Sequence, residues 1–152
     1  MNLSPNQQRL FDKYKPELER LCGAPITIDK NHIATIGKFG AWEYMVRCPD
    51  PIKRWANLVS CWIMTELPGC CGACVSLNAI VYTSYEGKGI GTILNKLRID
   101  MAREDGYGLL ICTDEKNNEH QRRILAKNGW KDVDEWVNPR TTHTVKLSAI
   151  HL

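Results

Sequence analysis

The residues of this chain best placed to do chemistry are three glycines at alternate positions, Gly87, Gly89 and Gly91, in the segment YEGKGIGT at 85–92. Glycine tolerates positive φ and carries no side chain that would keep an anion away from the backbone N–H groups. An amphipathic segment follows from Ile93, so the positive end of a helix dipole would face the same point. The pattern predicts a turn that cradles a phosphate or pyrophosphate group.

The spacing of the glycines argues against two common nucleotide motifs. A Walker loop requires Ser or Thr after its Gly-Lys pair, whereas Lys88 is followed by Gly89. The Rossmann fingerprint has two residues between its second and third glycines, and only Ile90 separates Gly89 from Gly91. An ordinary glycine-rich turn between a strand and a helix remains the plainer alternative.

The segments around the turn have the periodicity that such a site needs. Residues 74–82 predict a strand that leads into the turn, and residues 93–102 predict a helix that ends at Gly106. Farther along, we expect a strand at 109–112, a helix at 118–128, and strands near 133–137 and 143–150.

The N-terminal half begins with a helix signal. Ser4 and Gln7 flank Pro5 as a capping box, which predicts a helix to about Leu21. Short strands are expected at 26–28, 32–36 and 41–48, as an antiparallel hairpin with a turn at 38–40. Residues 50–67 fit a helical period that begins at Asp50-Pro51, although 58–64 would also pass as a buried strand; we favour the helix.

Length and charge narrow the class of protein. At 152 residues the chain predicts one domain with a single core. A net charge of +3 lacks the strongly basic balance of a dedicated nucleic-acid binder. No run approaches the roughly 18 apolar residues of a membrane span, and residues 1–10 do not resemble a leader. We therefore expect a cytoplasmic protein with no membrane partner.

The seven cysteines predict free thiols, because an odd number cannot form a closed disulfide set. Cys70, Cys71 and Cys74 contain one C-x-x-C, but no second such pair accompanies it. We expect no metal, and a zinc-bound interaction domain is a minor alternative.

The loop resembles the pyrophosphate loop of the GNAT acyltransferase superfamily, whose usual form is Arg or Gln, two residues, Gly, one residue, and Gly or Ala. Gly89 and Gly91 match it, while Glu86 occupies the Arg/Gln place, where we expect its carboxylate to point out of the loop. Asn118 lies eleven residues before Gly129-Trp130, which is similar to the family's Asn…Gly-Phe pattern. The likeness covers about 74–152.

The resemblance implies an α/β fold with a mixed, mostly antiparallel twisted sheet flanked by helices, in which the fourth and fifth strands splay apart. Residues 1–152 would form one domain, with 1–73 on the acceptor side and 74–152 as the cofactor-binding core. It further implies an N-acetyltransferase that uses acetyl-CoA as co-substrate and transfers the acetyl group to a primary amine by direct attack on the thioester. The implied cofactor-binding residues are Ile80, Val81, Gly87, Lys88, Gly89, Ile90, Gly91, Thr92 and Asn118.

The proton-transfer groups usual in that family are missing. Residues 68–85 contain no Asp, Glu or His where related enzymes often have a general base. Leu125 occupies the place of the Tyr that commonly acts as their general acid. We name Asp114, His120 and Tyr82 as candidate catalytic substitutes. Candidate residues on the acceptor side are Trp136, Asn138 and Arg140.

The missing acid and base keep two alternatives open: a nucleic-acid base modifier and a catalytically silent CoA-binding module. A basic face for nucleic acid would be built from Arg98, Arg103, Arg122, Arg123 and Lys127. A small molecule or a protein could supply the amine. A homodimer could form through the apolar strand at 145–150.

Overall fold

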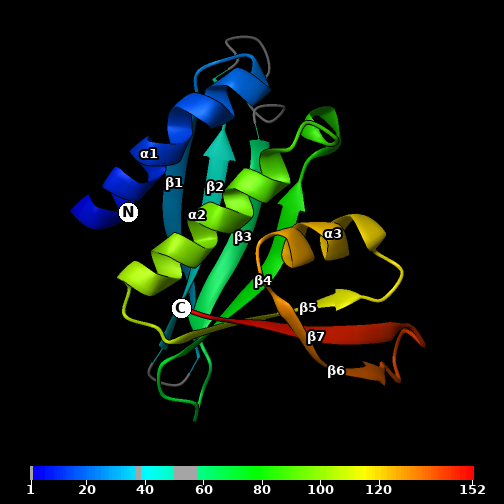
Figure 1. Ribbon diagram of the computed structural model, residues 1–152. Coiled ribbons are helices and arrows are strands. Elements are labelled where there is room, and N and C mark those ends of the chain that lie inside the picture. The colour runs from blue at the N-terminus through cyan, green and yellow to red at the C-terminus, as the bar shows by residue number, and fades with distance from the viewer. Residues whose placement is uncertain (1, 37–38, 50–57) are drawn as a thin grey trace.

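The computed structural model describes residues 2–36, 39–49 and 58–152 (Figure 1). Along the chain lie helix α1 (Pro5–Cys22), strands β1 (Thr27–Ile36), β2 (Phe39–Arg47), β3 (Leu58–Glu66) and β4 (Ala73–Val81), the 3-10 turn η1 (Thr83–Tyr85), helix α2 (Ile90–Glu104), strand β5 (Leu109–Glu115), helix α3 (Glu119–Lys127), and strands β6 (Lys131–Val137) and β7 (Thr144–His151).

The strands form one seven-stranded sheet in the order β1-β2-β3-β4-β5-β7-β6. Every neighbouring pair is antiparallel except β4 and β5, which are parallel. These two strands pair only at their beginnings, from Ala73↔Leu109 to Val75↔Ile111. Beyond that point they separate, and β5, β7 and β6 run across the direction of β1–β4 (Figure 1). The mixed sheet with splayed fourth and fifth strands is therefore confirmed.

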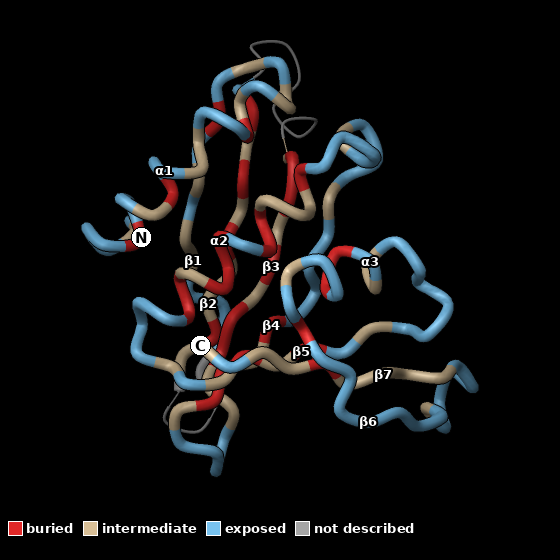
Figure 2. The backbone as a smooth tube through the Cα atoms, in the orientation of Figure 1, coloured by how far each residue is buried: buried red, intermediate tan, exposed pale blue. Residues whose placement is uncertain are grey.

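The helices lie against the sheet, with α2 between α1 and α3 (Figure 1). The core forms where α1 and α2 cover β2, β3 and β4, and Figure 2 shows buried backbone concentrated there. Its largest members include the stacked rings of Tyr44 and Trp62, whose centroids are 5.2 Å apart. Within the described residues, no helix is both long and apolar enough to cross a membrane.

Polar contacts cap the start of α1 and join the middle of α2 to the residues that follow α3. Ser4 Oγ accepts from the Gln7 backbone N–H while Ser4 N–H donates to Gln7 Oε1, both at 3.2 Å, so the predicted capping box is confirmed. Inside the core, Asn95 Oδ1 on α2 accepts from Asn128 Nδ2 and from Trp130 Nε1, each at 2.9 Å. Asn95 thereby joins α2 to the segment that leaves α3.

The helix predicted over 50–67 is wrong in its described part, because 58–66 forms β3. Strand β3 pairs with β2 and β4, and both of its faces contain buried residues. Burial on both faces removes the simple polar alternation of a half-exposed strand, so the apolar residues also fit a helical period. Residues 50–57 lie outside the described part of the chain.

Two smaller expectations also change. Of the turn predicted at 38–40, Phe39 and Gly40 belong to β2, while residues 37–38 lie outside the described part. The C-terminal strand β7 is hydrogen-bonded to β5 on one side and to β6 on the other. It therefore has no free edge through which residues 145–150 could pair across a dimer.

Candidate functional site

The glycine turn connects the end of β4 to the start of α2. Gly87 and Gly89 have φ of 74° and 84°, in the left-handed region that favours glycine, and Gly89 is the N-cap of α2. Because Gly89 has no side chain, no side-chain oxygen caps the first N–H groups of α2, although the Gly89 carbonyl accepts from the N–H groups of Thr92 and Ile93. The local geometry is that of an anion-binding helix N-terminus.

A cavity of about 510 Å³ opens beside this turn. Strands β3 and β4, the turn, and helices α2 and α3 all contribute to its wall. The lining residues are Ser60, Cys61, Trp62, Ala79, Ile80, Val81, Glu86, Gly87, Gly91, Leu94, Arg98, Asn118, His120, Gln121 and Ile124.

Most of the predicted cofactor-binding residues meet at this cavity. Ile80, Val81, Gly87, Gly91 and Asn118 line it, and Gly89, Ile90 and Thr92 line a smaller hollow next to it. The two hollows share Val81, Glu86, Gly87, Gly91, His120 and Ile124. Lys88 lines neither, and its Nζ lies 5.5 Å from the ring centroid of Tyr85.

A bulge in β4 shapes the wall of the cavity. Cys61 pairs with Ile80 but Ile63 pairs with Leu77, so Asn78 and Ala79 together face the single residue Trp62. Asn78 has φ of 49°, which is uncommon for a residue other than glycine. Such a bulge re-aims the backbone, and the four residues 77–80 are all exposed. Ser60 Oγ fixes the bend by donating to the Ile80 carbonyl at 2.6 Å.

Two of the three candidate catalytic residues lie near the cavity. His120, on the first turn of α3, lines it directly. Tyr82 follows β4 and is 37% exposed, with its hydroxyl 3.7 Å from Sγ of the lining residue Cys61. The hydrogen bond with Cys61, together with partial burial, raises the pKa of Tyr82, so its hydroxyl keeps its proton at neutral pH.

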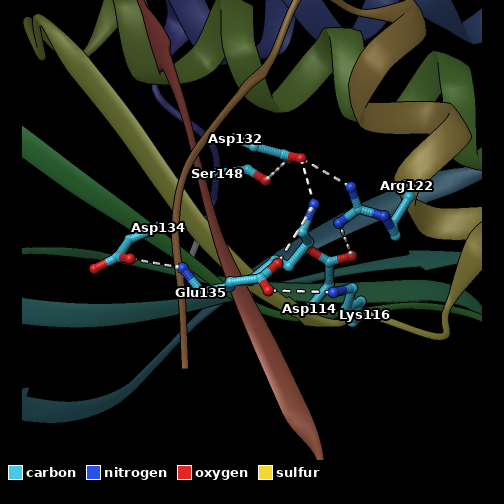
Figure 3. Close-up of polar contacts among 8 residues, drawn as sticks. Asp114, Lys116, Arg122, Asp132, Asp134, Glu135 and Ser148 are labelled. Atoms are coloured by element: carbon cyan, nitrogen blue, oxygen red, sulfur yellow. Dashed lines mark hydrogen bonds and ion pairs between the residues drawn. The ribbon is translucent and has the colours of Figure 1, made fainter. Parts of the chain in front are cut away.

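Asp114 lies elsewhere, in an ionic cluster beneath α3 (Figure 3). Its side chain is 5% exposed, and Arg122 Nη1 is 3.9 Å from its Oδ2. Arg122 Nη2 and Lys146 Nζ bind the neighbouring Asp132 more closely, at 2.9 and 2.6 Å. Burial raises the pKa of Asp114 more than Arg122 lowers it, whereas hydrogen bonds from Lys146 and Arg122 lower the pKa of Asp132. Asp114 does not line the cavity.

The candidate acceptor residues lie at the far end of β6. Trp136 is 43% exposed, and the Asn138 side chain accepts from the Arg140 backbone N–H at 2.9 Å in the β6–β7 turn. None of the three lines the cavity.

The proposed basic face is not assembled. Arg98 is buried rather than exposed, and three of its supposed companions pair with carboxylates. These pairs are Arg103 with Asp100, Arg122 with Asp132, and Arg123 with Glu119. For the cysteine alternative, Cys70 and Cys71 are exposed while Cys74 is buried, and the described residues hold no cluster of His, Cys, Asp or Glu that could hold a metal ion.

Sequence reasoning missed the wall formed by β3, namely Ser60, Cys61 and Trp62, because it placed them in a helix. The alternative interpretation of 58–64 as a buried strand would have indicated these three residues. It also assigned Arg98 to an exposed basic face rather than to the cavity, although the spacing from Gly91 and Leu94 places all three residues on one face of α2.

The fold defined by this sheet and its splayed strands is that of the GNAT acetyltransferases. An IAA acetyltransferase from Bacillus cereus is 14% identical, with a TM-score of 0.64 over 84% of this chain and 99% of that one. A GNAT family acetyltransferase from Elizabethkingia anophelis with acetyl-CoA bound is 17% identical, with a TM-score of 0.63 over 84% and 98%. Spermidine/spermine N-acetyltransferase SpeG from Vibrio cholerae is 11% identical, with a TM-score of 0.65 over 86% and 94%. The sequence matches no protein-family model and no curated protein.

Proposed function

We propose that this chain is an N-acetyltransferase that moves an acetyl group from acetyl-CoA to a primary amine. The observation that carries the proposal is one cavity that the glycine turn, α2 and α3 share with the part of β4 that is no longer paired with β5. Its fold supports the same assignment, because similar structures include a protein with acetyl-CoA bound.

The residues present fit the cofactor. The N–H groups of 87–91 and the dipole of α2 suit a pyrophosphate, while the Thr92 N–H donates to the Gly89 carbonyl. Beyond Val75 the edge of β4 that faces β5 has no strand partner, so backbone groups on that edge near Ile80 and Val81 would pair with the amides of pantetheine, although the Ile80 carbonyl also accepts from Ser60 Oγ. Asn118 lines the same cavity from the start of α3.

When bound, acetyl-CoA supplies an activated acyl group, and the chain contributes position and proton transfer. A new carbon–nitrogen bond forms as the carbon–sulfur bond breaks. The amine loses one proton, and the departing CoA thiolate takes up one proton to become the thiol. A backbone N–H at the β4 bulge would donate to the thioester oxygen. An alkylamine with a pKa near 10.4 is less than about 0.1% neutral at pH 7, so a proton acceptor helps.

Among the candidates, the cavity favours His120 as the group that accepts the amine proton, because an imidazole can do so near neutral pH. Tyr82 is the candidate proton donor to the leaving thiolate, because its hydroxyl lies beside Cys61, which lines the cavity. Asp114 has no such access. Leu125, in the place of the family's Tyr, is 3% exposed and packs in the core.

The test is release of free thiol from acetyl-CoA across a panel of amines, measured with a thiol-trapping dye. The panel contains spermidine, because SpeG has the same fold, and a peptide with a free N-terminus. We expect release that depends on one class of amine. His120→Gln should lower kcat at least about 10-fold, while His151→Gln, on an exposed residue of β7, should not.

The buried Leu125 favours one rival, a CoA-binding module without catalysis. That rival predicts tight CoA binding with no thiol release for any amine, and this result would overturn the enzyme proposal. A nucleic-acid modifier is less favoured, because four of the five cations it needs are buried or paired.

A further inference from the structure

Arg98 is a buried cation without an ionic partner. The residue is 5% exposed, and its Nη1 donates to Ser76 Oγ at 3.0 Å. Throughout 2–36, 39–49 and 58–152, no carboxylate forms an ion pair with it, although it forms part of the cavity wall. Burying a cation against one neutral hydroxyl is unfavourable, so an anion that enters the cavity would be bound there.

The charge of Arg98 persists at neutral pH. Burial lowers the pKa of Arg98 to about 10, which still leaves the guanidinium protonated. The thiol of Cys112 is its titratable neighbour, and burial raises the pKa of Cys112 to about 12. Because that thiol stays neutral, it does not compensate the cation.

Arg98 lies at the inner end of the cavity. Ser76 and Cys112 directly follow Val75 and Ile111, the last residues at which β4 and β5 are paired. Arg98 therefore reaches the point where the two strands separate. Along α2 it is seven residues from Gly91, or about 10 Å of helix. The glycine turn and the buried cation thus line one cavity at points separated by about 10 Å along α2.

We propose that the inner end of this cavity binds a carboxylate carried by the acyl group of the CoA donor, with Arg98 as the residue that selects it. This inference rests on the proposed function and extends its donor range from acetyl to short acyl groups that end in a carboxylate. A guanidinium offers a planar fork of N–H donors that matches a carboxylate. The donor is the ligand that also reaches the glycine turn, so its acyl end is the part that meets Arg98.

The experiment compares succinyl-CoA with butyryl-CoA by isothermal titration calorimetry, because the two acyl groups have the same number of carbon atoms and differ in the terminal carboxylate. The wild-type protein should bind succinyl-CoA about 10- to 100-fold more tightly, the range for hydrogen bonds to a charged group. Equal affinities, or a preference for butyryl-CoA, would overturn the inference.

Three variants locate the effect. Arg98→Met removes the charge at similar length and should abolish the preference for succinyl-CoA, with the affinity for CoA itself measured alongside. Arg98→Lys keeps the charge and should retain part of the preference, which a merely structural role would not predict. Arg103→Met, on an exposed residue of the same helix that pairs with Asp100, is the matched control and should change neither.

Free succinate separates this inference from the proposed function. Millimolar succinate, against chloride of the same ionic strength, should raise the melting temperature of the wild type but not of Arg98→Met. If that shift is seen and CoA does not bind, the proposed function fails while the anion site stands. If CoA binds without any preference for a carboxylate and succinate gives no shift, the anion site fails while the proposed function stands.

Discussion

At the scale of single residues, Asp114 and Arg98 carry opposite charges but share one feature. Each side chain is buried without a close partner of opposite charge. Asp114 has Arg122 Nη1 at 3.9 Å, too far for a hydrogen bond, and neither of its carboxylate oxygens has a hydrogen-bond partner. Arg122 instead turns its other amino group to Asp132 (Figure 3). Asp114 therefore lowers stability when it is ionised.

Replacing Asp114 by Asn should stabilise the protein at neutral pH. Its pKa in the folded state is raised, so the folded state binds a proton more tightly than the unfolded chain and loses stability as pH rises through that pKa. Asp114→Asn should raise the free energy of unfolding at pH 7 by on the order of 1 kcal/mol, the size of one unsatisfied buried polar group.

Urea unfolding at several pH values checks this prediction. The advantage of Asp114→Asn should shrink on acidification through the raised pKa and vanish below the ordinary Asp value of 3.8, where the wild type is protonated as well. Asp12→Asn, on an exposed face of α1, should give no advantage at any pH. A gain that persists at acid pH would contradict the electrostatic account.

At the scale of elements, the backbone conformation of the glycine turn shapes the proposed binding site. An Ala side chain at Gly89 would meet no heavy atom within 4 Å, so its cost comes from the positive φ alone. Gly89→Ala should lower the free energy of unfolding by about 1 kcal/mol and weaken CoA binding several-fold.

Gly108→Ala is the matched control for this substitution, because Gly108 also has open space around it but lacks the left-handed φ. It should leave stability unchanged or raise it by up to about 1 kcal/mol. Thermal melts and calorimetry on both variants suffice. Equal losses at the two positions would mean that the conformation of the turn is not what matters.

Elements governed by neighbours in sequence were predictable. The capping box of α1, the glycine turn and the ends of α3 depend on residues a few positions apart, and they lie within one residue of where the sequence places them, although α2 begins at Ile90, three residues before the predicted start. Strand β3 was not predictable, because its partners β2 and β4 decide its conformation and burial on both faces hides its alternation. The bulge at Asn78 also depends on register against Trp62, which no local pattern encodes.

At the scale of the whole molecule, one departure from regular pairing produces the cavity. Because β4 and β5 are parallel and pair only from Ala73 to Val75 on β4, the sheet opens beyond that point, and α2 and α3 cover the opening. The sequence predicted the part of the site built by the turn. It did not predict Arg98, since the interior position of that side chain follows from packing of α2 across the split sheet.

The most direct test of the central claim is a map of backbone amide chemical shifts in ¹⁵N-labelled protein as CoA is added. The account predicts saturable changes that are largest for residues 87–92, 80–81 and 118, with little change in β1 or in the β6–β7 turn. Changes centred on another surface, or none at millimolar CoA, would contradict the claim that the cavity between the glycine turn and the splayed strands is a CoA site.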